Sequence, residues 1–373
     1  MKITAIEVGV VTMPLKGTYA TAHGTVAIQR SAIARIRTDA GLEGWGNVDP
    51  TPGYSEMGVE EVVAAAKERL GPALVDSDPL NITAALHRMD ALCPGRNEAK
   101  ALLEMALFDL KGKALGVPVW SLLGGKLRNE VALNAWIGAV PPERAAAEAA
   151  EWCRLGFRSA KIKVGGEFKG DVARVGAVRE AVGAKVSLRV DANEGLNVES
   201  AIRLARALAP YEISLFEQPV PRTDLRGLAR IRRASPIPIM ADESVRDAET
   251  LLELIRLEAA DLIKVKVMKQ GGILRTLRLV AIAEAAGLGV ILGHGFGLWM
   301  STLAELHVAA ASLAILDGCE AVGPLKMAGE VVTNPPDMRC GSIEVPDAAG
   351  LGVEPDENLL ARYGWENIGS KSD

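Results

Sequence analysis

Five short apolar segments in the middle of the chain each end in an ionisable residue. The endings are Lys163, Asp191, Glu217, Asp242 and Lys266, and neighbouring endings lie 24 to 28 residues apart. A strand, a helix and two short loops need about 30 residues, so we expect these endings at equivalent places on successive parallel strands. In a closed barrel of such units, the C-terminal strand ends converge on one mouth. The spacing therefore predicts two lysines and three carboxylates around one pocket.

The lysines of the second and sixth expected strands have a type and placement that suit proton transfer. Side chains alternate along a strand, so Lys161 and Lys163 share one face, which must be the barrel interior if either lysine acts. Two close ammonium groups and partial burial each lower a lysine pKa, so at least one of the two is expected to become a usable base. The alternative is a pair of surface lysines. Lys264 and Lys266 also share a face, and alternation does not choose between them.

The three acids come from the third, fourth and fifth expected strands. Asp191, Glu217 and Asp242 would repel one another and raise their own pKa values unless a metal ion lies among them. An all-oxygen ligand set suits Mg²⁺, with Mn²⁺ as second choice, and no His or Cys is placed to favour zinc. As an alternative, Asp191 or Asp242 could serve as the N-cap of the next helix.

A cation facing two lysines across a pocket suits removal of the proton beside a carboxylate. The ion would bind the carboxylate and stabilise the developing enediolate while one lysine takes the proton. A second lysine on the opposite face would return it.

A regular alternation of strands and helices is expected to position these residues. The expected strands are 131–137, 158–164, 186–191, 213–217, 237–241, 261–266, 289–293 and a shorter one near 319–322. The expected helices are 142–155, 170–182, 197–209, 222–234, 247–257, 272–286 and 300–312. Eight strands and seven helices predict an α/β protein with a parallel barrel whose last helix is short or missing.

The first part of the chain has a different pattern. Residues 3–13 and 28–38 read as antiparallel strands, and three helices are expected over 59–70, 81–92 and 97–115. Polar, glycine-containing loops are expected over 16–24 and 47–55. We therefore expect an α+β domain over residues 1–127, the barrel over 128–323, and a tail over 324–373 that packs back on the first domain.

Composition narrows the classes of partner. The net charge of −5 and the pI near 5.6 argue against nucleic-acid binding, which requires clustered basic residues. The widely spaced Cys93, Cys153, Cys319 and Cys340 form no CxxC pair, so neither a disulfide framework nor a zinc site is expected. No uninterrupted apolar run reaches about 18 residues, the length needed to cross a membrane. We expect a cytoplasmic protein that does not bind membranes.

The chain resembles the enolase superfamily, and within it the muconate lactonizing enzyme (muconate cycloisomerase) subgroup of the mandelate racemase/muconate lactonizing family. The resemblance covers nearly the whole chain. It rests on these motifs: Ala106-Leu107-Phe108-Asp109-Leu110-Lys111-Gly112-Lys113, Leu122-Leu123-Gly124-Gly125-Lys126, Lys161-Ile162-Lys163, Asp191-Ala192-Asn193-Glu194-Gly195, Phe216-Glu217-Gln218-Pro219, Ala241-Asp242-Glu243-Ser244, Lys266-Val267-Met268-Lys269-Gln270-Gly271-Gly272 and Glu320-Ala321-Val322-Gly323-Pro324. It implies a modified TIM barrel of the (β/α)7β type, with an α+β N-terminal capping domain completed by the C-terminal tail.

The resemblance also implies roles for individual residues. Asp191, Glu217 and Asp242 would hold Mg²⁺, Lys163 and Lys266 would be the opposed acid/base pair, and the segments 16–24 and 47–55 would form a lid that contributes to substrate choice. Lys161 would be an electrostatic helper. Further residues expected around the substrate are Asn193, Glu243, His294, Glu320, Tyr19 and Tyr54. A homo-oligomer, either an octamer or a dimer, would also follow from the resemblance.

Two departures from relatives limit the expected substrates. Racemases of the mandelate type pair a seventh-strand His with a sixth-strand Asp, whereas here the sixth strand carries Lys266, so His294 is interpreted as pocket lining or as structural. Dipeptide epimerases carry an Asp-x-Asp on the eighth strand, and this chain has Glu320-Ala321-Val322 there.

The expected function is therefore racemisation or epimerisation of a carboxylate substrate such as an amino-acid derivative. Muconate-type cycloisomerisation comes second, and dehydration of a hydroxy acid or hydroxyproline third. A non-catalytic relative that only binds a metal or ligand is the alternative of another class.

Overall fold

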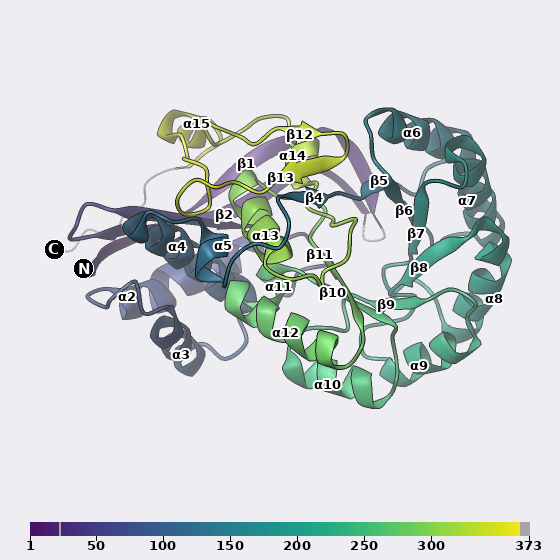
Figure 1. The fold of residues 1–373 in the computed structure, drawn as a ribbon, viewed down its shortest axis with the longest axis horizontal. Coiled ribbons are helices and arrows are strands. Elements are labelled where there is room, and N and C mark those ends of the chain that lie inside the picture. The colour runs from purple at the N-terminus through teal and green to yellow at the C-terminus, as the bar shows by residue number, and fades with distance from the viewer. Residues whose placement is uncertain (22–23, 366–373) are drawn as a thin grey trace.

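The N-terminal part of the molecule is a three-stranded antiparallel sheet. The computed structural model describes residues 1–21 and 24–365. Strands β1 (Ile3–Thr21), β2 (Gly24–Thr38) and β3 (Glu43–Val48) lie in that order in the sheet. Figure 1 shows β1 and β2 in purple. The prediction of a loop over 16–24 is wrong for the residues of this range that the structure describes. Tyr19 pairs with Val26, and the β1–β2 ladder continues to Thr21 and Gly24. Residues 22 and 23 lie outside the described residues.

Helix α4 (Asn97–Leu115) packs directly on this sheet and is buried along most of its length. Two glycines of β3 allow the close approach, since a Cβ at Gly44 would lie 2.2 Å from Ala106 O and one at Gly46 would lie 2.3 Å from Leu102 O. The other helices of this part are α1 (Val59–Ala64), a π-helical continuation (Ala65–Leu70), α2 (Gly71–Leu74), α3 (Ile82–Leu92) and α5 (Val119–Leu122).

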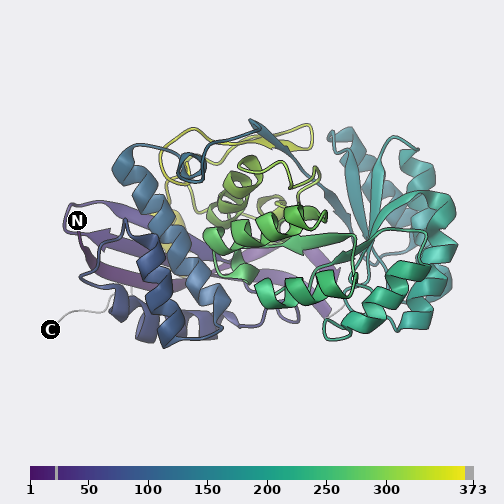
Figure 2. The same cartoon turned by 60° about the horizontal axis from the view of Figure 1, so that its bottom comes forward.

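The middle of the chain forms a curled parallel sheet wrapped by helices, seen at the right of Figures 1 and 2. Its seven strands follow one another in chain order from β5 to β11. They are β5 (Ala135–Ile137), β6 (Ser159–Lys163), β7 (Ser187–Asp191), β8 (Ile213–Glu217), β9 (Ile239–Ala241), β10 (Leu262–Val265) and β11 (Gly289–Leu292). This arrangement confirms the predicted α/β barrel class.

Two expectations about the barrel strands are corrected. The strand expected over 131–137 is divided: β4 (Glu130–Ala132) pairs with a strand of the tail, and β5 alone enters the barrel. In the part of the chain that the structure describes, 319–322 forms no strand. Bridges join Leu133 to Cys319 and Val290 to Ile315, and Glu320 N donates to Leu292 O, so the chain around this segment closes the barrel between β5 and β11 without a regular strand.

The barrel helices begin at their own caps, which removes one alternative for the acids. Asn197, Asp224 and Asp247 accept hydrogen bonds from the first-turn N–H groups of α8, α9 and α10. Asp191 and Asp242 therefore are not the N-caps of the helices that follow them. The helices of this part are α6 (Pro142–Arg154), α7 (Phe168–Val182), α8 (Val198–Leu208), a 3₁₀ turn (Ala209–Tyr211), α9 (Leu225–Ala234), α10 (Ala248–Arg256), α11 (Val267–Gln270), α12 (Ile273–Ala285) and α13 (Trp299–Ala310).

The tail returns to the N-terminal sheet. It contains α14 (Gly323–Lys326), β12 (Met338–Arg339), β13 (Ser342–Glu344) and α15 (Glu357–Arg362). Thr12 N donates to Tyr363 O at 2.8 Å, Arg35 pairs with Glu357, and β13 pairs with β4. Figure 1 shows α15 lying beside the purple sheet.

Among the described residues, no helix is both long and apolar enough to cross a bilayer.

Candidate active site

A cavity of about 610 Å³ lies at the C-terminal ends of the barrel strands, and residues of the N-terminal part line one side of it. Every residue singled out from the sequence as a site candidate lines this cavity: Lys161, Lys163, Asp191, Asn193, Glu217, Asp242, Glu243, Lys266, His294, Glu320, Tyr19 and Tyr54. The structure therefore brings all of them together.

The second-strand lysines both reach the acid of the third strand. Lys163 and Asp191 are paired in the β6–β7 ladder, and their side chains meet with Nζ 2.7 Å from Oδ2. Lys161 Nζ lies 3.0 Å from the same oxygen. Burial alone lowers the pKa of each ammonium, but Asp191 and the other nearby acidic groups together outweigh it, so the pKa values of Lys161 and Lys163 are both raised. The expected lowering is wrong for this arrangement of charges.

Glu217, at the end of β8, accepts from lysines on both sides. Lys161 Nζ lies 3.0 Å from one of its oxygens and Lys264 Nζ 3.1 Å from the other. The same two ammonium groups reach Glu320, with Lys161 at 2.6 Å. Burial and repulsion from Asp191 raise the pKa of Glu217 to about 8 in spite of these lysines.

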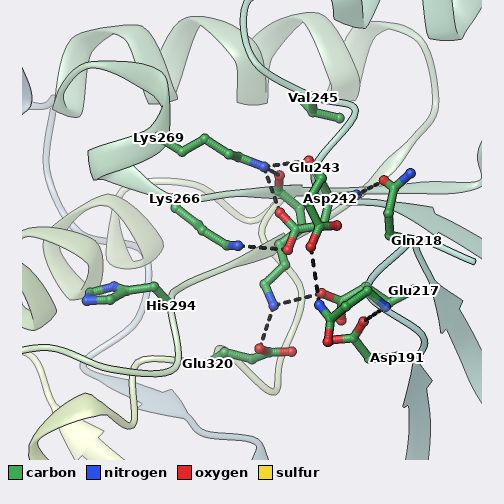
Figure 3. Close-up of polar contacts among 12 residues, drawn as sticks. Asp191, Glu217, Gln218, Asp242, Glu243, Val245, Lys266, Lys269, His294 and Glu320 are labelled. Atoms are coloured by element: carbon green, nitrogen blue, oxygen red, sulfur yellow. Dashed lines mark hydrogen bonds and ion pairs between the residues drawn. The ribbon is translucent and has the colours of Figure 1, made fainter. Parts of the chain in front are cut away.

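The sixth strand separates its two lysines by depth. Lys264 lies on β10, and its side chain contacts Glu217 and Glu320. Lys266 follows the strand and places its Nζ 2.7 Å from Asp242 Oδ2 (Figure 3). Lys269, one helical turn further on, donates to Asp242 Oδ1 at 2.7 Å. Attraction to Lys266 and Lys269 outweighs burial, so the pKa of Asp242 falls well below its ordinary value.

The acids fit a hard divalent cation in ligand type, and they stand at the ends of three successive barrel strands. Asp191 and Glu217 end neighbouring strands and are paired in the ladder, Asp242 directly follows the next strand, and all three are almost fully buried. The Lys161 ammonium already places one cation 3.0 Å from both Asp191 and Glu217. Among the described residues, no three His, Cys, Asp or Glu side chains converge on one point as placed. Each carboxylate instead contacts ammonium groups.

Asn193 and Glu243 form a bridge at the edge of the acids. Asn193 accepts from Lys163 and donates to Glu243 Oε1 at 3.2 Å. Asn193 holds a left-handed backbone with φ of +41°, which turns its side chain back toward the strand ends. The Tyr54 ring lies 5.7 Å from Lys163 Nζ. Lys163 is therefore positioned by three neighbours.

His294 has two acidic partners, and both come from elements other than the neighbouring barrel strand. Its Nδ1 lies 3.1 Å from Glu305 of α13, and its Nε2 lies 3.4 Å from Asp49, which follows β3 in the N-terminal part. Burial lowers the pKa of His294, but these two carboxylates raise it overall to about 10. The missing sixth-strand acid is thus replaced by acids from two other elements.

Four polar residues of the site were missed from the sequence. Lys269 belongs to the motif that begins at Lys266. Its spacing of three residues from Lys266 would place the two side chains on the same side of a helical turn, and this is the signal that would have found it. Asp49 directly follows β3, Glu305 lies within α13 and Lys326 ends α14. None of them stands at the repeating strand-end position, so spacing gave no signal for them.

Two family models cover most of the chain. Residues 3–124 match the N-terminal domain of the mandelate racemase/muconate lactonizing enzyme family, and residues 144–359 match the family described as enolase C-terminal domain-like.

Individual relatives match over nearly their whole length. The chain is 34% identical to the N-succinyl-L-Arg/Lys racemase of Bacillus cereus, covering 96% of this chain and 97% of that one, and the structure of that racemase superposes with a TM-score of 0.94. A muconate lactonizing enzyme of Pseudomonas fluorescens, solved with muconolactone, gives a TM-score of 0.94 at 34% identity over 97% and 99% of the two chains. A dipeptide epimerase of Enterococcus faecalis, solved with Mg and L-Leu-L-Tyr, gives 0.90 at 35% identity over 95% and 100%.

Proposed function

The chain belongs to the mandelate racemase/muconate lactonizing enzyme family of the enolase superfamily, and we propose that within it the protein is a Mg²⁺-dependent racemase or epimerase. It is an isomerase, as its named relatives are racemases, epimerases and cycloisomerases. The proposed reaction moves the proton on the carbon next to a substrate carboxylate from one face of that carbon to the other.

The observation that carries this proposal is the placement of the two lysines. Lys163 ends β6 and Lys266 follows β10, and the three strands between them are those that carry Asp191, Glu217 and Asp242. In a barrel of eight positions, the second and sixth face each other across the mouth. A substrate held at the acids would therefore have one amine on each side of its α-carbon, as a two-base racemisation requires.

The side chains divide the work as follows. Asp191, Glu217 and Asp242 would hold the divalent ion, which supplies charge stabilisation for the enediolate that forms when the α-proton leaves. Lys163 removes or returns the proton on one face, and Lys266 acts on the other. Lys161 keeps a positive charge 3.0 Å from both Asp191 and Glu217.

Muconate-type cycloisomerisation is the second candidate, and a specific observation favours it. Glu320-Ala321-Val322 stands where dipeptide epimerases carry a pair of acids, and the muconate lactonizing enzyme superposes as well as the racemase does. The same lysines and acids would serve this reaction.

Solvent-deuterium exchange tests the proposal. The protein is incubated with Mg²⁺ in deuterated buffer near pH 8 with N-acylated amino acids, dipeptides, muconates and hydroxyprolines, and loss of the α-proton signal is followed by proton NMR. Exchange with inversion identifies a racemase or epimerase substrate, and lactone formation from muconate identifies the second candidate. Silence across the whole panel supports a binding protein and contradicts the proposal.

A further inference from the structure

Lys326 is a buried lysine on the cavity wall that the proposed reaction does not use. It is the last residue of α14, is only 4% exposed and lines the cavity. Its Nζ lies 4.2 Å from the ring centres of Trp136 and Phe296 and 5.3 Å from that of Tyr19. It donates one hydrogen bond, to Gly295 O at 2.6 Å.

Trp136, Phe296 and Tyr19 form an aromatic cage around this amine, and Gly295 O accepts its hydrogen bond. Aromatic faces attract a cation, and this attraction offsets part of the cost of burial. Among the described residues, no carboxylate lies within ion-pair distance of Lys326. Burial and repulsion from Lys163 lower the pKa of Lys326 well below its ordinary value. An anion bound beside Lys326 would oppose both effects and favour the charged form of the amine.

Lys326 differs from the other lysines that line the cavity. Those five each contact at least one carboxylate: Lys161, Lys163, Lys264, Lys266 and Lys269. Among the described residues, Lys326 is the cavity lysine without such a partner, and a divalent ion at the acids would add further positive charge to the cavity. Burying an unpaired charge is costly, so an anion entering beside Lys326 is favoured.

The position of Lys326 shows which part of a substrate would meet it. Glu217 ends β8, the fourth strand of the barrel, whereas Lys326 follows the segment that closes the barrel between β11 and β5. These are opposite sides of the mouth. A substrate whose reacting carboxylate lies toward Glu217 extends its far end toward Lys326, Trp136 and Phe296.

From this cage we infer that Lys326 binds a second anionic group at the far end of the substrate. The inference rests on the proposed function and deepens it, because it restricts the substrate to molecules that carry two anionic groups, such as an N-acyl amino acid with a carboxylate on the acyl chain or an unsaturated diacid. A substrate with an ammonium group at that end is repelled. Lys326 is a specificity residue and takes no part in proton transfer.

Matched substrate pairs test this role with the Mg²⁺-loaded enzyme. The first pair is N-succinyl and N-succinamoyl derivatives of arginine, phenylalanine and alanine, which differ only in a terminal carboxylate or amide. The second is cis,cis-muconate and its monomethyl ester. Kinetics of α-proton exchange or lactone formation give kcat/KM for each member. We expect the dianion to be preferred by at least about tenfold, which corresponds to about 1.4 kcal/mol.

Variants separate a charge effect from a packing effect. Lys326→Met keeps the apolar stem and is expected to bring the ratio within each pair close to one, whereas Lys326→Arg keeps a preference for the dianion. A merely structural role would lower both members of a pair together and preserve the ratio, which would overturn the inference. Lys185→Met, an exposed lysine, is the control and should retain the wild-type ratio.

The two proposals fail in different ways. If wild-type enzyme processes both members of every active pair equally well, the inference about Lys326 is wrong while the proposed reaction stands. If no compound of either pair exchanges or lactonises, and neither does the broader panel, the proposed function is wrong and the inference falls with it.

Discussion

Neighbouring carboxylates control the protonation of the candidate bases. Lys163 is largely buried, which by itself would favour the neutral amine, yet the contact with Asp191 at 2.7 Å raises its pKa overall. Lys266 shows the same effect from Asp242 at 2.7 Å. Each lysine is therefore a poor base while its acid is free to pair with it. A divalent ion that engages both acids would weaken this attraction, which links proton abstraction to metal binding.

Single-lysine variants test the two-base assignment. Lys163→Ala and Lys266→Ala are each expected to lower racemisation by about 10² to 10⁴, the usual contribution of a general base. The proposed two-base reaction places the lysines on opposite sides of the α-carbon, so each variant should retain deuterium exchange into only one enantiomer, and the two variants should differ in which one. Chiral chromatography and proton NMR measure both quantities. Wild-type racemisation by either variant would contradict the assignment.

Metal binding is testable without a substrate. Mg²⁺ added to chelator-treated protein is expected to raise the melting temperature, because a ligand at 100 times its Kd stabilises the folded state by about 2.7 kcal/mol. Glu217→Gln should abolish this rise, whereas Glu180→Gln, at an exposed acid on α7, should keep it. Scanning fluorimetry across a Mg²⁺ series gives the readout. An undiminished rise in Glu217→Gln would remove that residue from the ligand set.

The sequence predicted the site residues that end barrel strands and missed those held by tertiary contacts. Asp191, Glu217 and Lys163 stand at one repeating position, so their spacing placed them together. Lys326 lies at the cavity between Trp136 and Phe296, which come from other parts of the chain. The local sequence Gly323-Pro324-Leu325-Lys326 therefore contains no signal for these contacts. The pKa values of the lysines were also mispredicted, since burial was foreseen but the short contacts to carboxylates were not.

At the scale of elements, one helix of the N-terminal part caps a helix of the barrel. Glu104 of α4 is fully buried and accepts from the backbone N–H groups of Ile273 and Leu274, the first residues of α12, with Leu274 N at 3.1 Å. Burial raises the pKa of Glu104 to about 7, although the N-terminal N–H groups favour its charge. The contact requires Gly272, where a Cβ would lie 2.0 Å from Glu104 Oε2.

Glycines at the two ends of α12 form a matched pair for testing this contact. Gly272 precedes the helix with φ of +125° and Gly287 follows it with φ of +73°, and nothing lies within 4 Å of a Cβ built at Gly287. Gly287→Ala is expected to cost about 1 to 2 kcal/mol from backbone strain alone. Gly272→Ala should cost at least about 2 kcal/mol more, because its backbone (φ +125°, ψ 177°) lies in a region essentially confined to glycine and because Glu104 must also move. Urea unfolding measures both, and equal costs would show that Glu104 is not constrained there.

The strands that the sequence patterns misplaced are those whose position depends on hydrogen bonds to another strand and not on their own residue pattern. Residues 131–137 look like one apolar run, but β4 pairs with β13, which lies two hundred residues later, and only β5 joins the barrel. The polar residues at the end of β1 are typical of a loop, but this segment is a strand because it pairs with β2. Pairing partners distant in sequence decide both cases, and a local pattern contains no information about them.

At the scale of the whole molecule, a buried charge cluster joins the N-terminal part to the barrel. Asp49 accepts from Ser31 and Ser301 and lies 3.4 Å from His294, which in turn pairs with Glu305. Ser31 and Asn47, which also donates to Asp49, belong to the N-terminal sheet, whereas Ser301 and His294 belong to the barrel. Because Tyr19 and Tyr54 reach the cavity from the N-terminal part, this cluster helps to fix the position of the residues that cover the substrate.

Stability is expected to depend on pH through His294. Asp49 and Glu305 raise its pKa from 6.5 to about 10 in the folded protein, so its contribution is complete below pH 6.5 and is lost as the pH rises through 10. The shift corresponds to at most about 5 kcal/mol. In urea unfolding between pH 6.5 and 10, His294→Gln should flatten the decline in unfolding free energy relative to wild type.

A second buried histidine provides the control for this test, because its shift has the opposite sign. Burial lowers the pKa of His307 to about 4, so its contribution is lost only as the pH falls from 6.5 toward 4. His307→Gln should therefore reduce stability by a similar amount throughout the alkaline range and keep the wild-type slope. If His294→Gln kept that slope as well, the two acids would not hold His294 in its charged form, and the joint between the two parts of the molecule would rest on hydrogen bonds and packing alone.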